Sequence, residues 1–193
     1  MSVLLMAIVI PIVGVIAIVI ITCFVLYNGL VGKKNRVENA FATIDTMLKK
    51  RYDLIPNLVA MVKQYMKHES GVLTEITALR AKATAGGVSS DEKVDLNNRI
   101  GSALQGIMVA VEAYPELKAN ENFRHLQRTL NEVEEQISAA RRAFNAAVTV
   151  FNNAVEMFPS NIMANMMGYA RRRLFEIPRE ERENVNVGDL FNS

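Results

Sequence analysis

The side chains of this sequence that are best suited to acid–base or metal chemistry belong to two histidines, His68 and His125. Glu69 follows His68, but Ser, Gly and Val come next, so the second imidazole of a zinc-binding H-E-x-x-H helix is missing. The sequence also has no G-x-x-x-x-G-K-[ST] phosphate loop and no G-x-S-x-G nucleophile elbow. We therefore expect no catalytic residue, no metal and no cofactor, and an exposed helical position for each histidine.

Four polar residues interrupt an otherwise apolar pattern and need partners if they are buried. They are Asp45, Arg51, Asp53 and Asn57. Arg51 is expected to bridge to Asp53 or to a carboxylate on another helix. Such pairing is architectural, and we favour it over a binding role for these residues.

Further along the chain, Asn145 and Asn152 are spaced to share one helix face. Their amides are expected to hydrogen-bond across a bundle and to fix its register. A methionine cluster follows, and core filling is favoured for it over an adaptable docking surface. The cluster consists of Met157, Met163, Met166 and Met167.

The elements that carry these residues are predicted from hydrophobic periodicity. From Phe123 to Phe158, apolar or small residues recur at alternating steps of three and four, which predicts one long helix that ends before Pro159. The same repeat is compatible with a dimeric coiled coil. Alanines in the seam favour burial within a bundle instead.

Residues 37–83 show the same alternation, interrupted by Arg51 and Glu69. Pro56 lies inside this stretch, and two interpretations remain open. In one, the chain forms a helical hairpin, Asp53 caps its second helix and Pro56 occupies the first turn. In the other, a single kinked helix loses a backbone hydrogen bond at Pro56.

The clearest loop is the Ala-Gly-Gly-Val-Ser-Ser run of residues 85–90. Ser89 and Glu92 form a capping box that predicts the start of another helix. That helix is expected to stop near Pro115, and a short helix is expected over residues 162–169. The polar residues after these elements are expected to be mobile or loosely docked.

Residues 3–26 are almost wholly apolar, and no acidic or basic side chain precedes Lys33. As a helix this segment reaches about 36 Å, more than the ~30 Å hydrocarbon core of a bilayer requires. It lacks the basic n-region and the A-x-A pattern of a cleaved signal peptide, and the residues before Cys23 do not fit a lipoprotein site. We therefore predict an uncleaved, single-pass transmembrane helix.

Three basic residues, Lys33, Lys34 and Arg36, follow this segment at once. The positive-inside rule then places the N-terminus outside and the remaining residues in the cytoplasm. The net charge of +2 does not indicate a nucleic-acid partner. About 165 residues remain after the anchor, enough for one compact domain that is rich in helix-forming residues.

Several motifs resemble those of bacterial LemA proteins. They are Lys-Arg-Tyr-Asp-Leu-Ile-Pro-Asn-Leu-Val at residues 50–59, Arg-Arg-Ala-Phe-Asn at 141–145, Phe-Asn at 151–152, Phe-Pro at 158–159 and Gly-Tyr at 168–169. The first of these runs is specific, and the resemblance covers nearly the whole chain. It implies an all-α fold in which a single N-terminal transmembrane helix precedes an antiparallel up-and-down four-helix bundle.

The resemblance implies less about activity, because the family has no established biochemical function. Its members are linked to membrane organisation, including magnetosome formation, and to neighbourhoods with membrane proteases. For this chain it implies a bacterial cytoplasmic (inner) membrane location. Residues 1–2 would be extracytoplasmic, 3–26 the transmembrane helix, 27–170 the helical bundle and 171–193 a polar tail.

Taken together, the sequence indicates a non-catalytic, membrane-anchored helical scaffold or protein-binding module. The expected partners are the lipid bilayer, unidentified membrane or cytoplasmic proteins and further copies of the chain, with no small-molecule substrate. The alternative is an accessory subunit of a membrane enzyme such as a protease. A cleft with converging titratable groups would favour that alternative.

Overall fold

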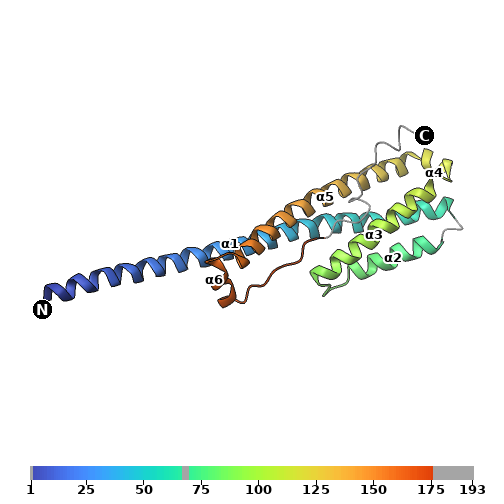
Figure 1. Ribbon diagram of the computed structural model, residues 1–193. Coiled ribbons are helices and arrows are strands. Elements are labelled where there is room, and N and C mark those ends of the chain that lie inside the picture. Colours follow the sequence, from blue (N-terminus) through green and yellow to red (C-terminus); the bar gives the residue numbers. More distant parts are fainter. Residues whose placement is uncertain (1, 67–69, 176–193) are drawn as a thin grey trace, which may run out of the picture. The chain divides into compact units, whose positions relative to one another are not determined.

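A computed structural model of the chain describes residues 2–66 and 70–175. Within these residues the secondary structure is entirely helical, which confirms the predicted all-α class. The helices of this part are α1 (Ser2–Tyr65), α2 (Ser70–Ala83), α3 (Ser90–Val111), α4 (Pro115–Ala119), α5 (Glu121–Glu156) and α6 (Ser160–Met166) (Figure 1).

Helix α1 runs through Pro56 without a break, so the hairpin interpretation is wrong. Asp53 lies inside the helix and caps nothing there. Ile55 and Leu58, on either side of the proline, are both buried on the same apolar stripe. Burying large aliphatic side chains contributes roughly 1.5–3 kcal/mol each, which offsets the hydrogen bond that the proline cannot make.

Helix α5 confirms the long helix predicted from the three-and-four repeat. The Asn120 side chain starts it by accepting a hydrogen bond from the Phe123 backbone N–H at 3.2 Å. Its buried seam runs from Phe123 to Val155, but the helix ends at Glu156. Phe158, which the repeat placed at the end of the seam, is therefore 79% exposed.

The loop between α2 and α3 also follows the prediction. Ser89 caps α3, because its hydroxyl accepts from the Glu92 backbone N–H at 3.2 Å. Gly87 has a φ of 84°, a left-handed conformation in which a side chain would be strained. Pro115 does more than end a helix: it occupies the first turn of the short helix α4, which the sequence did not predict.

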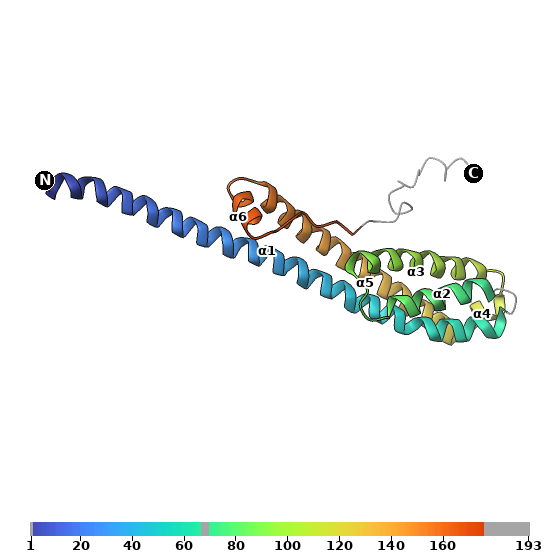
Figure 2. The ribbon, with the colours of Figure 1, turned by 90° about the horizontal axis from the view of Figure 1, so that it is seen from below.

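The chain forms two compact units, which we call the first and the second unit. The first unit comprises Met1–Thr43 and Arg142–Leu174, and the second comprises Ile44–Arg141 and Phe175–Ser193. In the second unit α2 and α3 lie side by side (Figures 1 and 2). The helices of that unit share an aliphatic and aromatic core, represented by Ile44, Leu58, Ile76, Ile100, Leu117, Phe123 and Ile137.

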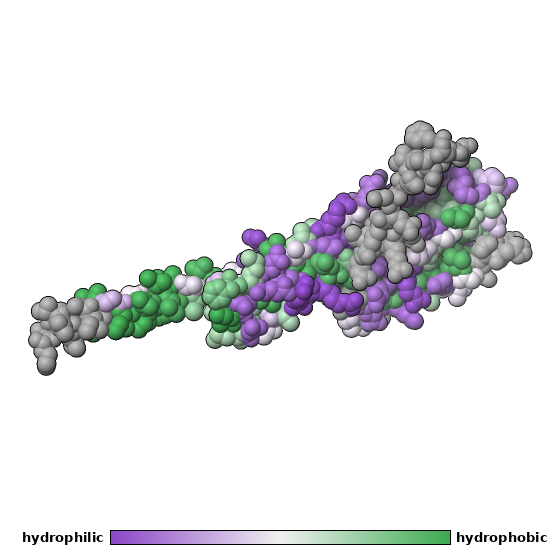
Figure 3. Space-filling view, in the orientation of Figure 1, coloured by the Kyte–Doolittle hydropathy of each residue, from purple (hydrophilic) through white to green (hydrophobic). Residues whose placement is uncertain are grey.

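The N-terminal part of α1, in the first unit, is long and apolar enough to cross a membrane. Its large aliphatic side chains from Val9 to Val25 are exposed rather than packed against other parts of the chain, and they form the green stretch in Figure 3. A core helix of a water-soluble protein would bury such residues. The exposed apolar surface is compatible with a membrane anchor.

Candidate functional site

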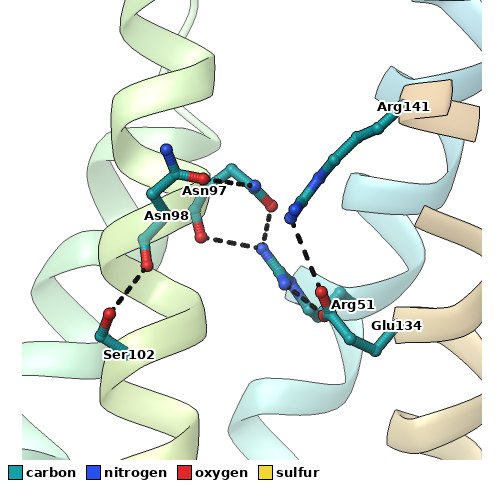
Figure 4. Close-up of polar contacts among 6 residues, drawn as sticks. All are labelled: Arg51, Asn97, Asn98, Ser102, Glu134 and Arg141. Atoms are coloured by element: carbon teal, nitrogen blue, oxygen red, sulfur yellow. Dashed lines mark hydrogen bonds and ion pairs between the residues drawn. The ribbon is translucent and has the colours of Figure 1, made fainter. Parts of the chain in front are cut away.

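The most developed polar site of the described residues is centred on Arg51, whose side chain comes from α1 and is completely buried. Its Nη1 donates to Glu134 Oε2 on α5 at 2.6 Å. Its Nη2 donates to the backbone oxygen of Asn97 on α3 at 3.1 Å, and also to the Asn97 side-chain oxygen (Figure 4). Of the two partners expected from the sequence, Arg51 takes the carboxylate on another helix and not Asp53.

Glu134 lies between two guanidinium groups. Its second carboxylate oxygen, Oε1, is 3.6 Å from Arg141 Nη2, and the Arg141 side chain is also buried. The Arg141 guanidinium in turn lies 5.2 Å from the ring centre of Phe175. One carboxylate thus serves two arginines, which leaves one positive charge over this triad.

A cavity of about 490 Å³ opens beside the triad within the second unit. Arg51 and Asn97 form its buried end, and the side chains of Ser102, Gln105 and Asn131 lie at its exposed rim. Arg51 Nε is buried there without a hydrogen-bond partner among the described residues. The cavity can therefore hold water or a small polar group.

The remaining polar residues of this part of α1 do not gather around Arg51. Asp45 pairs with Lys93 of α3, with Oδ1 and Nζ 2.5 Å apart. Asp53 and Asn57 are exposed to solvent. The four residues singled out by the sequence therefore form two interhelical contacts and two surface positions.

Tyr52 lies next to Arg51 and is buried, with no hydrogen-bond partner for its hydroxyl in the described part of the chain. Burial raises the pKa of this hydroxyl, because the phenolate would lose its hydration, and nearby Arg51 opposes the shift. The Tyr52 backbone oxygen accepts from Arg80 Nε on α2 at 2.8 Å. This stretch of α1 thus contacts α2, α3 and α5.

Asn152 is buried in the first unit and makes a two-way contact with the backbone of Arg172. Its Nδ2 donates to the Arg172 oxygen, and its Oδ1 accepts from the Arg172 N–H, both at 2.9 Å. We had expected Asn152 to bond to a facing helix. Its partner is instead the segment that follows α6. Asn145 is half-buried, and its backbone oxygen accepts from the Thr149 hydroxyl.

Of the basic residues after the apolar part of α1, Lys34 has partners within the first unit. Lys34 Nζ is 3.5 Å from Glu38 and lies over the ring of Tyr169, 6.0 Å from its centre. Lys33 and Arg36 line a small hollow of about 190 Å³ together with Ala147 and Val150 of α5. In the first unit, α1 and α5 are thus in contact next to the predicted span.

Two further predictions concern the methionine cluster and the two histidines. No member of the methionine cluster is buried, and Met157 and Met166 are exposed, so core filling is wrong for those two. The reason is that α5 ends early and the chain turns away from the seam. His125 is exposed on α5 as expected, whereas His68 lies outside the described residues.

Sequence reasoning missed Asn97, Glu134, Arg141 and Lys93. A signal for two of them was present: Glu134 and Arg141 each follow a seam residue, Leu130 and Ile137, by four positions and so flank the buried face. Nothing in the pattern marked Asn97 as the partner of Arg51, because the two residues are 46 positions apart.

Most of the chain is similar in sequence to several known proteins. "Protein LemA" of Metamycoplasma hominis is 26% identical over 165 residues, which are 86% of this chain and 75% of that protein. "Magnetosome protein MamQ 2" of Paramagnetospirillum magneticum is 23% identical, covering 81% of this chain and 67% of that protein. "Magnetosome protein MamQ" of Magnetospirillum gryphiswaldense is 21% identical, with 81% and 66% covered.

The family model for the LemA family matches residues 40–188, well over half of the sequence. The matched range begins within α1 and includes Arg51, Asn97, Glu134 and Arg141, the residues that form the polar site. On this match, and on the similarity to Protein LemA, the chain belongs to the LemA family.

Proposed function

We propose that this protein is a membrane-anchored, non-catalytic helical scaffold or protein-binding module. The observation that carries the proposal is the exposed apolar part of α1, residues 9–25, in the same unbroken helix as the buried Arg51. Lipid would cover the side chains that the chain itself leaves uncovered. The polar continuation of the helix would then keep the folded part at the membrane.

The proposed topology has the N-terminus outside and the remainder in the cytoplasm of a bacterium. Lys33, Lys34 and Arg36 support this orientation through the positive-inside rule. The relatives named as magnetosome proteins support a role in membrane organisation.

The proposed arrangement of the second unit is an antiparallel up-and-down four-helix bundle made of the end of α1, α2, α3 and the beginning of α5. Its support is the contact of α1 with the other three helices, through Arg51 to α3 and α5 and through the Tyr52 backbone to α2. Short loops of the kind that joins α2 to α3 favour antiparallel neighbours. Such a bundle offers long, rigid helix faces for protein partners.

The Arg51 site supports an architectural role. Its charged groups bind one another and a backbone oxygen, so they join three helices instead of pointing jointly at an open position. A buried arginine with these partners fixes which helices meet and in what register.

A second candidate function is that of an accessory subunit of a membrane enzyme, and the cavity beside Arg51 favours it. Arg51, Glu134 and Arg141 line this space of about 490 Å³. In this alternative a partner's residue or substrate would complete the site.

Crosslinking in intact cells, with identification of the crosslinked neighbours, tests the proposal when it is combined with sizing of the full chain in lipid nanodiscs. We expect a stable oligomer or a reproducible protein neighbour. A monomer with no reproducible neighbour would contradict the scaffold and binding roles.

A matched pair of variants separates the two candidates once a neighbour is known. Asn131→Lys changes the cavity rim, and Asn153→Lys makes the same change at another exposed position of α5. The scaffold proposal predicts that neither variant alters the activity of a neighbouring enzyme. Loss of that activity with Asn131→Lys alone would favour the accessory-subunit function.

A further inference from the structure

In the first unit, contacts between α1 and α5 show which residues of the two helices lie opposite one another. Phe41 of α1 packs edge-on against Phe144 of α5, with ring centres 5.8 Å apart. Further along α5, Ala147 and Val150 share a hollow with Lys33 and Arg36. As the residue numbers rise on α5 they fall on α1, so the two helices run antiparallel here, as both ribbon views show (Figures 1 and 2).

This register places the end of α5 beside the end of the predicted span. Val150 lies opposite Lys33 and Arg36. Helix α5 continues for six residues beyond Val150, about 9 Å, and ends at Glu156, so Phe158 lies in the turn that follows. The matching position on α1 is close to Gly29, within one helical turn of the end of the predicted span of residues 3–26.

The turn and short helix at this level expose large apolar side chains. Phe158 is 79% and Met166 78% exposed, and Met157 and Ile162 are exposed as well. Ile162 and Met166 are four residues apart on α6 and so lie on one face. We call Met157, Phe158, Ile162 and Met166 the apolar tip.

The stretches of the first unit that contain or adjoin the apolar tip are rich in basic residues. Residues 27–41 and 150–174 contain six Lys or Arg and two Glu, a clear excess of positive charge. Arg172 lies beside α1, with its Nη2 3.4 Å from Glu38, and Arg171 pairs with Glu156 at 3.1 Å. Exposed apolar side chains with neighbouring cations match the boundary between acyl chains and anionic headgroups.

We propose that the apolar tip is a second membrane contact, in which Met157, Phe158, Ile162 and Met166 insert into the headgroup region of an anionic bilayer. The proposal rests on the membrane anchoring proposed above. With residues 3–26 across the bilayer, the level of Tyr27 is the lipid–water boundary, and the end of α5 lies within about one helical turn of it, at the headgroups. Two attachments, the anchor and the tip, then fix the first unit against the surface.

Lipid is a better occupant of this surface than a protein partner for two reasons. The anchor places the tip at the bilayer boundary, and the surrounding charge is complementary to anionic headgroups.

The test uses the full chain in vesicles of phosphatidylcholine with phosphatidylglycerol, and a polarity-sensitive fluorophore on one cysteine at a time. Native Cys23, exposed on the apolar part of α1, reports on the anchor. In a Cys23→Ala background, Phe158→Cys reports on the tip. Ala143→Cys is the control, because it is exposed on α5, about 20 Å along the helix from its last residue, Glu156. Nitroxide-labelled lipids then measure depth by quenching.

We expect strong quenching at Cys23 by nitroxides in the upper part of the acyl chains, because it lies about 6 Å inside the level of Tyr27. We expect several-fold quenching at position 158 by headgroup nitroxides, and emission at position 143 as in water. Quenching at position 158 should weaken in vesicles of phosphatidylcholine alone. A quenched Cys23 with a water-exposed position 158 would overturn the membrane contact of the tip alone. An unquenched Cys23 would instead overturn the proposed anchoring. A position 158 shielded from both water and nitroxide lipids would indicate a protein contact and contradict the proposal.

Discussion

The two units of this protein treat apolar and charged side chains in opposite ways. The second unit hides its large aliphatic residues, such as Ile137, and buries a charged arginine with partners on two other helices. The first unit exposes aliphatic residues from Val9 to Val25 and again at Met157, Phe158, Ile162 and Met166. Its Arg172–Glu38 pair, in contrast to the Arg51 site, is accessible to solvent.

The contrast shows that each unit suits a different surrounding. In water, each Å² of apolar surface that stays exposed on the first unit forgoes about 25 cal/mol of stabilisation. In a bilayer, contact with lipid would supply this stabilisation. The second unit buries most of the large apolar side chains of its described residues, and its buried arginine has partners on α3 and α5.

The largest difference between the units should appear on shortening apolar side chains. Ile137→Ala should lower the free energy of unfolding by about 3–4 kcal/mol, because it leaves a cavity in the core of the second unit. Met166→Ala should cost below about 0.5 kcal/mol, since Met166 is 78% exposed. Urea unfolding of the full chain in detergent, followed by circular dichroism, measures both. Equal losses would remove the distinction between the units.

The next effect concerns one arginine–glutamate pair in each unit, Arg51–Glu134 in the second and Arg172–Glu38 in the first. Arg51→Met keeps the apolar stem but removes the donor to the Asn97 oxygens and to Glu134 Oε2, while Glu134 Oε1 keeps Arg141. The expected loss is about 2–3 kcal/mol, below the 3–5 kcal/mol of a fully buried pair, because Glu134 keeps a 45% exposed side chain that water can solvate. The same change at Arg172 should cost less than about 1 kcal/mol. Thermal unfolding of the two variants compares them, and a larger loss for Arg172→Met would contradict the comparison.

A smaller, local effect is expected at Asn152, the main buried polar group of the first unit. Asn152→Ala removes both bonds to the Arg172 backbone and should weaken the docking of residues 167–174 by about 1–2 kcal/mol. Hydrogen exchange at the Arg172 amide reports this directly. Asn152→Asp retains the acceptor, so it should preserve more of the protection than Asn152→Ala does. Unchanged exchange in both variants would mean that these bonds do not hold the segment.

The smallest effect is predicted for Tyr52. Tyr52→Phe should change stability by less than about 1 kcal/mol near pH 7, and in the stabilising direction, because the buried hydroxyl has no partner among the described residues. Burial raises the pKa of Tyr52, so the folded protein holds this proton more tightly than the unfolded chain does. The wild type should therefore lose stability relative to Tyr52→Phe as the pH rises above about 10, the ordinary tyrosine value. Parallel unfolding curves for the two proteins from pH 8 to pH 11 would contradict the buried, unpartnered hydroxyl.

Much of the fold could be predicted from the sequence, because helices show themselves in local periodicity. The long helix from Phe123, the Ser89 cap and the apolar N-terminal segment all follow from residues less than two turns apart. The passage of α1 through Pro56 could not be decided, since the proline's local cost competes with tertiary burial of Ile55 and Leu58.

The polar site was only partly predictable for a related reason. Arg51 stood out because it interrupts an apolar stripe, but its partners Asn97 and Glu134 are 46 and 83 residues away. Periodicity assigns residues to faces of helices and does not say which faces meet. The prediction that the methionine cluster fills the core was wrong for Met157 and Met166, because the seam repeat continues to Phe158 although the helix ends at Glu156.

The central claim is that the apolar part of α1 spans a membrane and holds the folded part on its cytoplasmic side. Labelling of single cysteines by a membrane-impermeant thiol reagent, in spheroplasts of cells that express the full chain, tests it most directly. In a Cys23→Ala background, Ser2→Cys should react before lysis, and Ala143→Cys should react only after lysis. Reaction of Ala143→Cys in intact spheroplasts, or recovery of the protein without membranes, would contradict the account.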